Sequence, residues 1–249
     1  MKGSSDTLIA NFLATMPPRY RSAHSTAAIL EHASIAAARG DRVAHVGSFV
    51  AEASGAYGLC VVADDRPGLL AMISAALLLA KLEVHNAEAY TRRRRDGVPE
   101  AVDLFWVQEK GGAAPTAATL SDERLATVAG RLHELLEGQV APSSALPGLS
   151  PATPTETTVR FVENDDGGLT TLEVQTTDRS GLLLALSQAL FETEVQIVSS
   201  EVRTRAGEVL DRFDLLERDG SSIKPDRRLA IQVAVLAAVQ EGARDVQSA

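Results

Sequence analysis

The chain has 249 residues and a formal net charge of −9; 45% of its residues are hydrophobic and only 4% are aromatic. This length allows one large domain or two small ones, and the apolar fraction is that of a folded protein rather than a disordered chain. The single cysteine, Cys60, excludes an internal disulfide framework and a cysteine zinc module. An acidic surface repels phosphate backbones, so we expect no nucleic-acid partner.

The sequence indicates neither a secretory signal nor a membrane-spanning segment. The opening sequence MKGSSDT is too polar for a secretory signal. The longest apolar stretch, residues 68–80, is shorter than the roughly 18–20 residues that span a bilayer. Together with the single cysteine, this predicts a cytoplasmic protein with no membrane partner.

Residues 1–40 are predicted to form a helical N-terminal extension. Apolar residues recur there at helical spacing, and the sequence MPPRY at residues 16–20 interrupts them. The pattern does not indicate what this extension does. The rest of the chain divides into a first unit (41–138), a linker (139–157) and a second unit (158–249).

A segment of the chain is repeated at an offset of 113 residues. Residues 59–92 align without a gap on residues 172–205, with 13 identities over 34 positions. The identities include an Asp-Arg-x-Gly-Leu-Leu sequence in each copy and a Glu-x-x-Thr-Arg ending. The copies meet again as AVDLFWV over VLDRFDL, after a loop that is about five residues longer in the first copy. The period is too long for a solenoid, so the repeat indicates a duplicated domain.

Each copy is predicted to run strand, tight turn, helix, strand, turn, strand, helix. In the first copy, residues 58–63 form the strand, the helix begins at Leu69, and residues 82–91 form a strand that turns at Asp96-Gly97. The corresponding features of the second copy are residues 171–176, Leu182, residues 195–204 and Ala206-Gly207.

The last helix of each copy is marked by its ends. Ser121 is the predicted N-cap of the first, and the second is predicted to run from Pro225 to about Ala243. Gly138 and Gly242 are the predicted stops.

The segment between the copies has the composition of a linker. It contains four prolines among serines, alanines and threonines, which predicts an extended chain. Residues 158–163 read as a strand that leads through Asn164–Gly168 into the second copy, and residues 42–50 read as a similar strand before the first. We expect these strands to be exchanged, with 159–162 completing the first unit and 43–50 completing the second.

The Asp-Arg-x-Gly turn can bind a small charged ligand. Gly68 and Gly181 let backbone amides approach a ligand closely, and the helix that follows points its N–H groups and positive dipole end at the same place, where a carboxylate would be held. Asp65 or Asp178 could accept hydrogen bonds from an ammonium group, so both charged groups of an amino acid would be satisfied. The same turn also suits a purely structural role, because strand-to-helix turns need a glycine and a capping oxygen.

The repeated βαββαβ pattern with this turn resembles the ACT domain, a small-molecule-binding regulatory module on a ferredoxin-like sheet. The tandem arrangement is similar to the C-terminal regulatory region of bacterial PII uridylyltransferases; the sequences AEAYTRR, VDLFWVQ and LEVQTTDRSGLL carry the likeness, and NFLATMPPRY resembles the connector before the pair. The resemblance implies an α+β fold of two ferredoxin-like units. It implies ligand-binding residues at both turns and at the start of the following strand: Asp65, Arg66, Gly68, Leu69, Leu70, Glu83, Asp178, Arg179, Gly181, Leu182, Leu183 and Gln196.

Two of these residues distinguish the copies. The family often presents an asparagine to its ligand at the opening of the second strand, where this chain has Glu83 in the first copy and Gln196 in the second. Gln196 keeps the amide chemistry, whereas Glu83 departs from it and puts ligand binding by the first copy in question.

The remaining polar residues have less specific interpretations. Arg66 and Arg179 are expected to face solvent or to pair with an acid. The run Arg92–Arg95 is read as a solvated hairpin tip, with docking to an acidic partner as the alternative. Trp106 is expected to pack against a helix or a second chain, and the five histidines have no metal-ligand spacing.

No catalytic motif stands out. The glycine turn with paired aspartates of nucleotidyltransferases is absent from the sequence, as is a His-Asp metal pair, and Cys60 lies in a predicted core strand. We therefore expect a non-enzymatic sensor of an amino acid, favouring glutamine, with no cofactor and with a homodimer and a regulated enzyme as partners. The alternatives are a ligand-free interaction scaffold that pairs through sheet edges and a uridylyltransferase-related enzyme.

Overall fold

The computed structural model describes residues 2–51, 55–94, 96–111, 119–148, 157–162 and 169–244. The elements, in chain order, are α1 (Lys2–Leu13), α2 (Pro18–Ala23), α3 (Thr26–Arg39), β1 (Ala44–Phe49), β2 (Tyr57–Asp64), α4 (Leu69–Leu79), β3 (Leu82–Arg93), β4 (Pro99–Glu109), α5 (Asp122–Leu136), the 3-10 helix η1 (Pro142–Gly148), β5 (Thr158–Val162), β6 (Thr170–Thr177), α6 (Leu182–Glu192), β7 (Val195–Arg205), β8 (Glu208–Glu217) and α7 (Pro225–Arg244). The predicted strands and helices of both copies are present, and the fold is the α+β class expected for tandem ferredoxin-like units.

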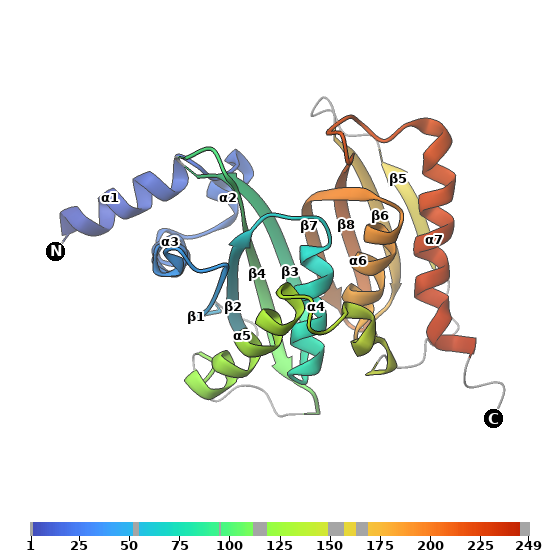
Figure 1. The fold of residues 1–249 in the computed structure, drawn as a ribbon, viewed down its shortest axis with the longest axis horizontal. Helices are drawn as coiled ribbons and strands as arrows, with labels where there is room; N and C mark the ends of the chain where they lie inside the picture. The colour runs from blue at the N-terminus through green and yellow to red at the C-terminus, as the bar shows by residue number, and fades with distance from the viewer. Residues whose placement is uncertain are drawn as a thin grey trace.

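The strands form one eight-stranded antiparallel sheet in the order β1-β2-β4-β3-β7-β8-β6-β5. Each unit contributes four consecutive strands, and the two halves are joined where β3 pairs with β7, from Asn86 opposite Arg203 to Tyr90 opposite Ser199. In Figure 1 the first unit occupies the left half of the sheet and the second unit the right half. The order of the second half is the mirror of the first, as a duplicated unit related by a two-fold axis requires.

The expected exchange of strands between the units is wrong. β1 pairs with β2 of the first unit, and β5 pairs with β6 of the second, so each strand completes the unit that directly follows it. A short connection between consecutive strands makes this antiparallel neighbour the closest one available. Residues 164–168, which were expected to connect β5 to β6, lie outside the described residues.

Four helices cover one face of the sheet. α5, α4, α6 and α7 contact one another in this order, so the helix layer runs across both units (Figure 1). The alternate strand residues beneath them are apolar and fully buried, among them Leu59, Phe105, Leu172 and Phe213. This continuous core fixes the two units relative to each other.

The N-terminal helices α1, α2 and α3 cover the opposite face of the first unit, and the expected helical extension and its break before Pro18 are confirmed. Tyr20 is fully buried there, and its hydroxyl lies 2.7 Å from Nδ1 of His32. Trp106 packs against this cluster through Phe49, with ring centroids 5.6 Å apart. The extension is therefore part of the folded body rather than a separate arm.

A buried ion network holds α3 to the sheet. Arg39 is 3% exposed and donates to Glu100 Oε1 and Asp64 Oδ1, both at 2.5 Å. Arg92 donates through Nε to the other Glu100 oxygen at 2.6 Å and lies over the Phe12 ring. The prediction of a solvated tip is therefore wrong for Arg92; Arg94 pairs with Asp96 near the turn, and Arg95 lies outside the described residues.

Two other expectations from sequence are corrected. Residues 142–148 of the linker form the 3-10 helix η1 instead of an extended chain, because Ala145 is buried where η1 contacts α4 and α6; residues 149–156 lie outside the described part. α7 continues through Gly242 to Arg244, whereas Gly138 does follow the end of α5 with a φ of +72°. None of the described helices has the length and apolar character of a membrane span.

Candidate functional site

The two Asp-Arg-x-Gly turns have the same backbone geometry. Gly68 and Gly181 cap α4 and α6 in the left-handed region, with φ of +77° and +79°. The N–H of Leu182 donates a hydrogen bond to the Arg179 carbonyl at 3.1 Å. The next two residues of the helix, Leu183 and Leu184, line a pocket. Residues at the start of each helix therefore line a cavity.

Each turn faces the other unit. The cavity at the second turn has a volume of about 250 Å³, and we call it the large pocket. The cavity at the first turn has a volume of about 40 Å³, and we call it the small pocket. The large pocket is lined by the turn residues Asp178–Leu184, by α4 and β3 of the first unit (Ser74, Leu78, Leu82, Glu83, Val84 and His85) and by β7 and β8 (Val202, Thr204, Val209 and Asp211). The small pocket is lined by Asp65–Ala71, by Ser187, Phe191, Val195, Gln196, Ile197 and Val198 of the second unit, and by Ala89, Tyr90, Thr91, Ala101 and Asp103.

The structure therefore exchanges the two strand residues that we assigned to each copy. Glu83 lies at the second turn with Asp178, and Gln196 lies at the first turn with Asp65. The cause is the antiparallel pairing of β3 with β7, which sets the beginning of each strand beside the turn of the other unit. Any effect of Glu83 falls on the pocket of the second turn, not on that of the first.

One pair of equivalent residues contributes to the difference in size. Phe191 of α6 projects over the first turn, and a Cβ built on Gly68 would lie 2.9 Å from Phe191 Cδ2. The repeat places Leu78 of α4 at the same position over the second turn, and it lines the large pocket. A leucine has a smaller volume than a phenylalanine, so the second turn keeps an open cavity and the first is nearly filled.

A second carboxylate lies inside each pocket, and the sequence analysis missed it. Asp103 on β4 and Asp211 on β8 are equivalent in the repeat, are 3% and 1% exposed, and line the small and the large pocket. Burial, with the nearby charge of Asp65, raises the pKa of Asp103 to about 8. Burial and the charge of Asp178 likewise raise the pKa of Asp211 well above its ordinary value.

The turn aspartates are perturbed in the same direction. Burial raises the pKa of Asp65, opposed by a hydrogen bond from the Thr91 hydroxyl at 3.0 Å. Burial also raises the pKa of Asp178, opposed by the charge of His85 and reinforced by that of Glu83. Ionising both carboxyl groups of a pocket costs free energy, because both are buried and their charges repel each other. Each pocket therefore favours a bound proton or a cation.

The large pocket contains polar atoms without partners. Both carboxylate oxygens of Asp211, the hydroxyl of Thr204 and Nε2 of His85 are buried and have no hydrogen-bond partner among the described residues. In the small pocket, the residue equivalent to Thr204 is Thr91, whose hydroxyl donates a hydrogen bond to Asp65. Unpartnered buried polar groups cost free energy, so their concentration in one cavity indicates a bound ligand or ordered water there.

The arginines of the two turns are partly buried, and both donate to backbone carbonyls of the same unit. Arg66 donates to the Leu136 carbonyl at 3.2 Å, and Arg179 donates to the Ala238 carbonyl at 3.0 Å and the Val239 carbonyl at 3.2 Å. They connect each turn to the last helix of its unit. The side chains of Leu69, Leu70, Leu182 and Leu183 are at most 6% exposed and belong mainly to the core.

Among the described residues, no group of three or more His, Cys, Asp or Glu side chains is arranged to hold a metal ion. Cys60 is fully buried in β2, and burial raises the pKa of its thiol, which opposes nucleophilic reactivity. Within the part of the chain that the structure describes, the large pocket is the one that combines open space with unpartnered buried polar atoms.

Comparison with known proteins identifies several relatives. A bifunctional uridylyltransferase/uridylyl-removing enzyme of Rhodospirillum rubrum is 32% identical over 73% of the chain, and that of Cereibacter sphaeroides is 28% identical over 74%. The enzyme of Phenylobacterium zucineum is 27% identical over 98% of the chain. The chain resembles the ACT-containing C-terminal region of these enzymes. No family model matches it.

The resemblance covers only a part of the relatives. The chain spans about a fifth to a quarter of the length of these uridylyltransferases, between 19% and 26%. Their ACT-containing region accounts for the tandem units found here, and partial coverage is consistent with a regulatory, non-catalytic module.

Proposed function

We propose that this chain is an amino-acid-binding regulatory protein, with glutamine as the favoured ligand, and that it has no catalytic activity of its own. The observation that carries the proposal is the large pocket, in which a helix N-terminus, Asp178 and a group of unpartnered polar atoms surround a cavity of about 250 Å³. This volume is just below the ~300–1,000 Å³ of sites for drug-sized molecules, and it suits a smaller ligand. The relation to the ACT-containing region of uridylyltransferases supports a regulatory role.

The chemistry of an amino acid matches the pocket group by group. The α-carboxylate is placed at the start of α6, where N–H groups and the helix dipole favour an anion. The α-ammonium is placed at Asp178. Glu83 and His85, from the other unit, surround the remaining space and can bond a polar side chain; the amide N–H₂ of glutamine would donate to Glu83.

The composite construction offers a way to transmit the state of the ligand. Since the pocket takes residues from both units, an occupied site makes contacts across β3 and β7 that an empty one lacks. The N-terminal helices pack on the opposite face of the first unit and would report this change to a regulated enzyme.

Isothermal titration calorimetry with glutamine, followed by the other amino acids, tests the proposal. We expect saturable binding with one site per chain, at the large pocket. Leu78→Phe reproduces the small pocket at the second turn and should abolish binding without changing any charge. The matched control Phe191→Leu enlarges only the small pocket and should leave that site intact; a folded chain that binds no amino acid would overturn the proposal.

An interaction scaffold is the second candidate, and the sheet edges favour it. β1 and β5 end the sheet, each with one strand neighbour in the part of the chain that the structure describes. Such edges can pair with a second copy or with a strand of a partner enzyme. Analytical ultracentrifugation over a range of concentrations, with and without glutamine, would measure whether a homodimer forms and whether it depends on the ligand.

A further inference from the structure

Asp211 is the buried group of the large pocket that the proposed function leaves without a role. It lies on β8, an inner strand of the second unit, with 1% of its surface exposed, and neither carboxylate oxygen has a hydrogen-bond partner among the residues described. The backbone amide of Arg203 on β7, outside hydrogen-bond geometry, offsets only part of the effect of burial on the pKa of Asp211. A carboxylate in this position needs either a proton or a cation to be stable.

The charged groups that face Asp211 determine whether a proton or a cation neutralises its carboxylate. Asp178 is close enough to repel it, and Glu83 adds a third carboxylate; the basic groups of the pocket are His85 and Arg179. Arg179 is directed to the α7 carbonyls. The ring nitrogen Nε2 of His85 has no partner within the described residues. The cavity therefore has more acidic than basic groups, and its own side chains leave Asp211 without an ion pair.

The small pocket shows the same pair in a closed form. Asp103 and Asp65 are equivalent to Asp211 and Asp178, but the Thr91 hydroxyl already donates to Asp65 and the cavity is only about 40 Å³. In the large pocket the equivalent Thr204 hydroxyl is unpartnered among the described residues, and space remains. The aspartate pair is thus present twice and open to a ligand once.

We propose that Asp178 and Asp211 together bind a primary ammonium group, and that Asp211 holds a proton in the empty pocket and loses it to solvent when the ammonium enters. This inference rests on the proposed function, and it adds a residue and a regulation to it. Binding would release a proton at pH values below the raised pKa of Asp211, so that affinity rises with pH in that range, until the ligand's own amine loses its proton. The Thr204 hydroxyl would supply a further hydrogen bond at the same place.

Three probes separate the parts of the site: L-glutamine, N-acetyl-L-glutamine and 4-aminobutanamide, which is glutamine without its carboxylate. With the wild-type chain, calorimetry in phosphate and in Tris buffer should give different heats for glutamine, because the two buffers take up the released proton with different enthalpies. N-acetyl-L-glutamine should not bind, whereas 4-aminobutanamide should bind weakly and still release a proton.

The isosteric variant Asp211→Asn cannot bear a charge, so it should bind glutamine roughly 10- to 100-fold more weakly and release no proton. Asp103→Asn, the equivalent change in the small pocket, is the matched control and should bind as the wild type does. Circular dichroism would check the fold of both variants, and the N-acetyl comparison tests the same point on the unmodified chain.

The outcomes distinguish the inference from the proposed function. If an amino acid binds without proton release and its N-acetyl derivative binds equally well, the ammonium site is wrong and the sensor function stands. If 4-aminobutanamide binds in an Asp211-dependent way but none of the twenty amino acids does, the ammonium site stands and the amino-acid function is wrong. Silence with all probes overturns both.

Discussion

Glu88 of β3 lies directly opposite Glu201 of β7, and these two residues are equivalent positions of the repeat. The pseudo-two-fold axis of the molecule therefore passes between two like charges. Both are compensated by neighbours: the Tyr90 hydroxyl donates to Glu88 at 2.7 Å, His24 Nε2 lies 3.1 Å from it, and Arg203 pairs with Glu201 and also lowers the pKa of Glu88. Although burial opposes it, these hydrogen bonds hold the pKa of Glu88 below its usual value.

Glu83 should contribute to ligand binding at a turn 95 residues further along the chain. We expect Glu83→Ala to weaken glutamine binding about tenfold, because one charged hydrogen-bond acceptor is lost from the large pocket. Gln196→Ala, its equivalent at the small pocket, should leave the affinity unchanged. Calorimetry on the two variants checks this; equal effects would contradict the assignment of Glu83 to the second turn.

Gly68 is held by its backbone and by a neighbour. Gly68→Ala should destabilise the fold by roughly 2–4 kcal/mol, which combines the left-handed backbone conformation with the close approach of Phe191. Gly97→Ala has the same kind of φ, +84°, with nothing within 4 Å, and should cost only about 1 kcal/mol. Urea unfolding measures both. In a chain that already carries Phe191→Leu, Gly68→Ala should cost only about as much free energy of unfolding as Gly97→Ala does, because the close contact is gone. An unchanged cost would argue against the Phe191 contact.

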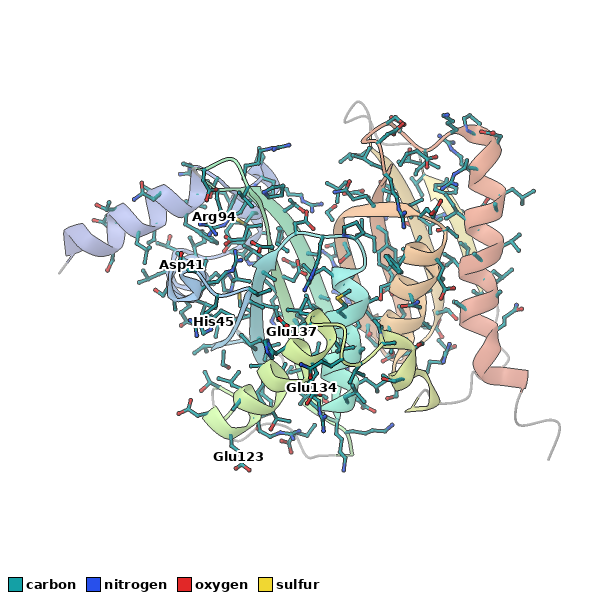
Figure 2. All side chains as sticks on the ribbon, viewed as in Figure 1. Asp41, His45, Arg94, Glu123, Glu134 and Glu137 are labelled. Atoms are coloured by element: carbon teal, nitrogen blue, oxygen red, sulfur yellow. The ribbon has the colours of Figure 1, made fainter. Side chains whose placement is uncertain are left out.

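Glu100 compensates two arginines in the buried network below α3. Glu100→Gln should lower the free energy of unfolding by about 3–5 kcal/mol, because Arg39 and Arg92 would keep buried charges without their shared partner. The control is Glu134→Gln on the surface of α5, where Figure 2 labels Glu134; it breaks the exposed pair with Arg131 and should cost less than about 0.5 kcal/mol. Thermal and urea unfolding measure the free energy of unfolding of both variants. Equal losses in Glu100→Gln and Glu134→Gln would contradict a stabilising role of the network.

Asp103 should make stability depend on pH. Its pKa is about 8 in the folded chain and near 4 in the unfolded one, so the unfolded state releases its proton first as the pH rises. The stabilisation by the protonated group is complete below pH 4 and is lost between about pH 4 and 8, at up to roughly 1.4 kcal/mol per pH unit. Asp103→Asn should reduce this slope and leave the part that Asp211, Asp65 and Asp178 contribute. Asp41→Asn, at the exposed position labelled in Figure 2, should keep it, and equal slopes in all three proteins would contradict the prediction.

The elements of each unit could be read from the sequence because local periodicity determines them. The Asp-Arg-x-Gly turn, the helices from Leu69 and Leu182, and the Ser121 cap are features of a few neighbouring residues. The partners of β1 and β5 could not be read in the same way, since strand alternation shows which face is buried but not which strand lies beside it. The assignment of Glu83 failed for the same reason.

Asp103 and Asp211 were missed for a different reason. A single aspartate within an apolar strand has no spacing that marks it as functional, and its burial depends on the helix layer above it. One signal was available: the two copies keep an aspartate at the same place in AVDLFWV and VLDRFDL, although few other residues of that strand are shared. An acidic residue retained on the inner side of both copies would have pointed to the pockets.

The difference between Leu78 and Phe191 is possible only because both units belong to one polypeptide. In a dimer of identical units, a substitution that fills one pocket would fill its symmetry mate as well, and a substitution that opens one would open both. Joining the copies in a single chain lets each position change alone. One half of a symmetric framework can then specialise in recognition while the other half becomes a packed support for it.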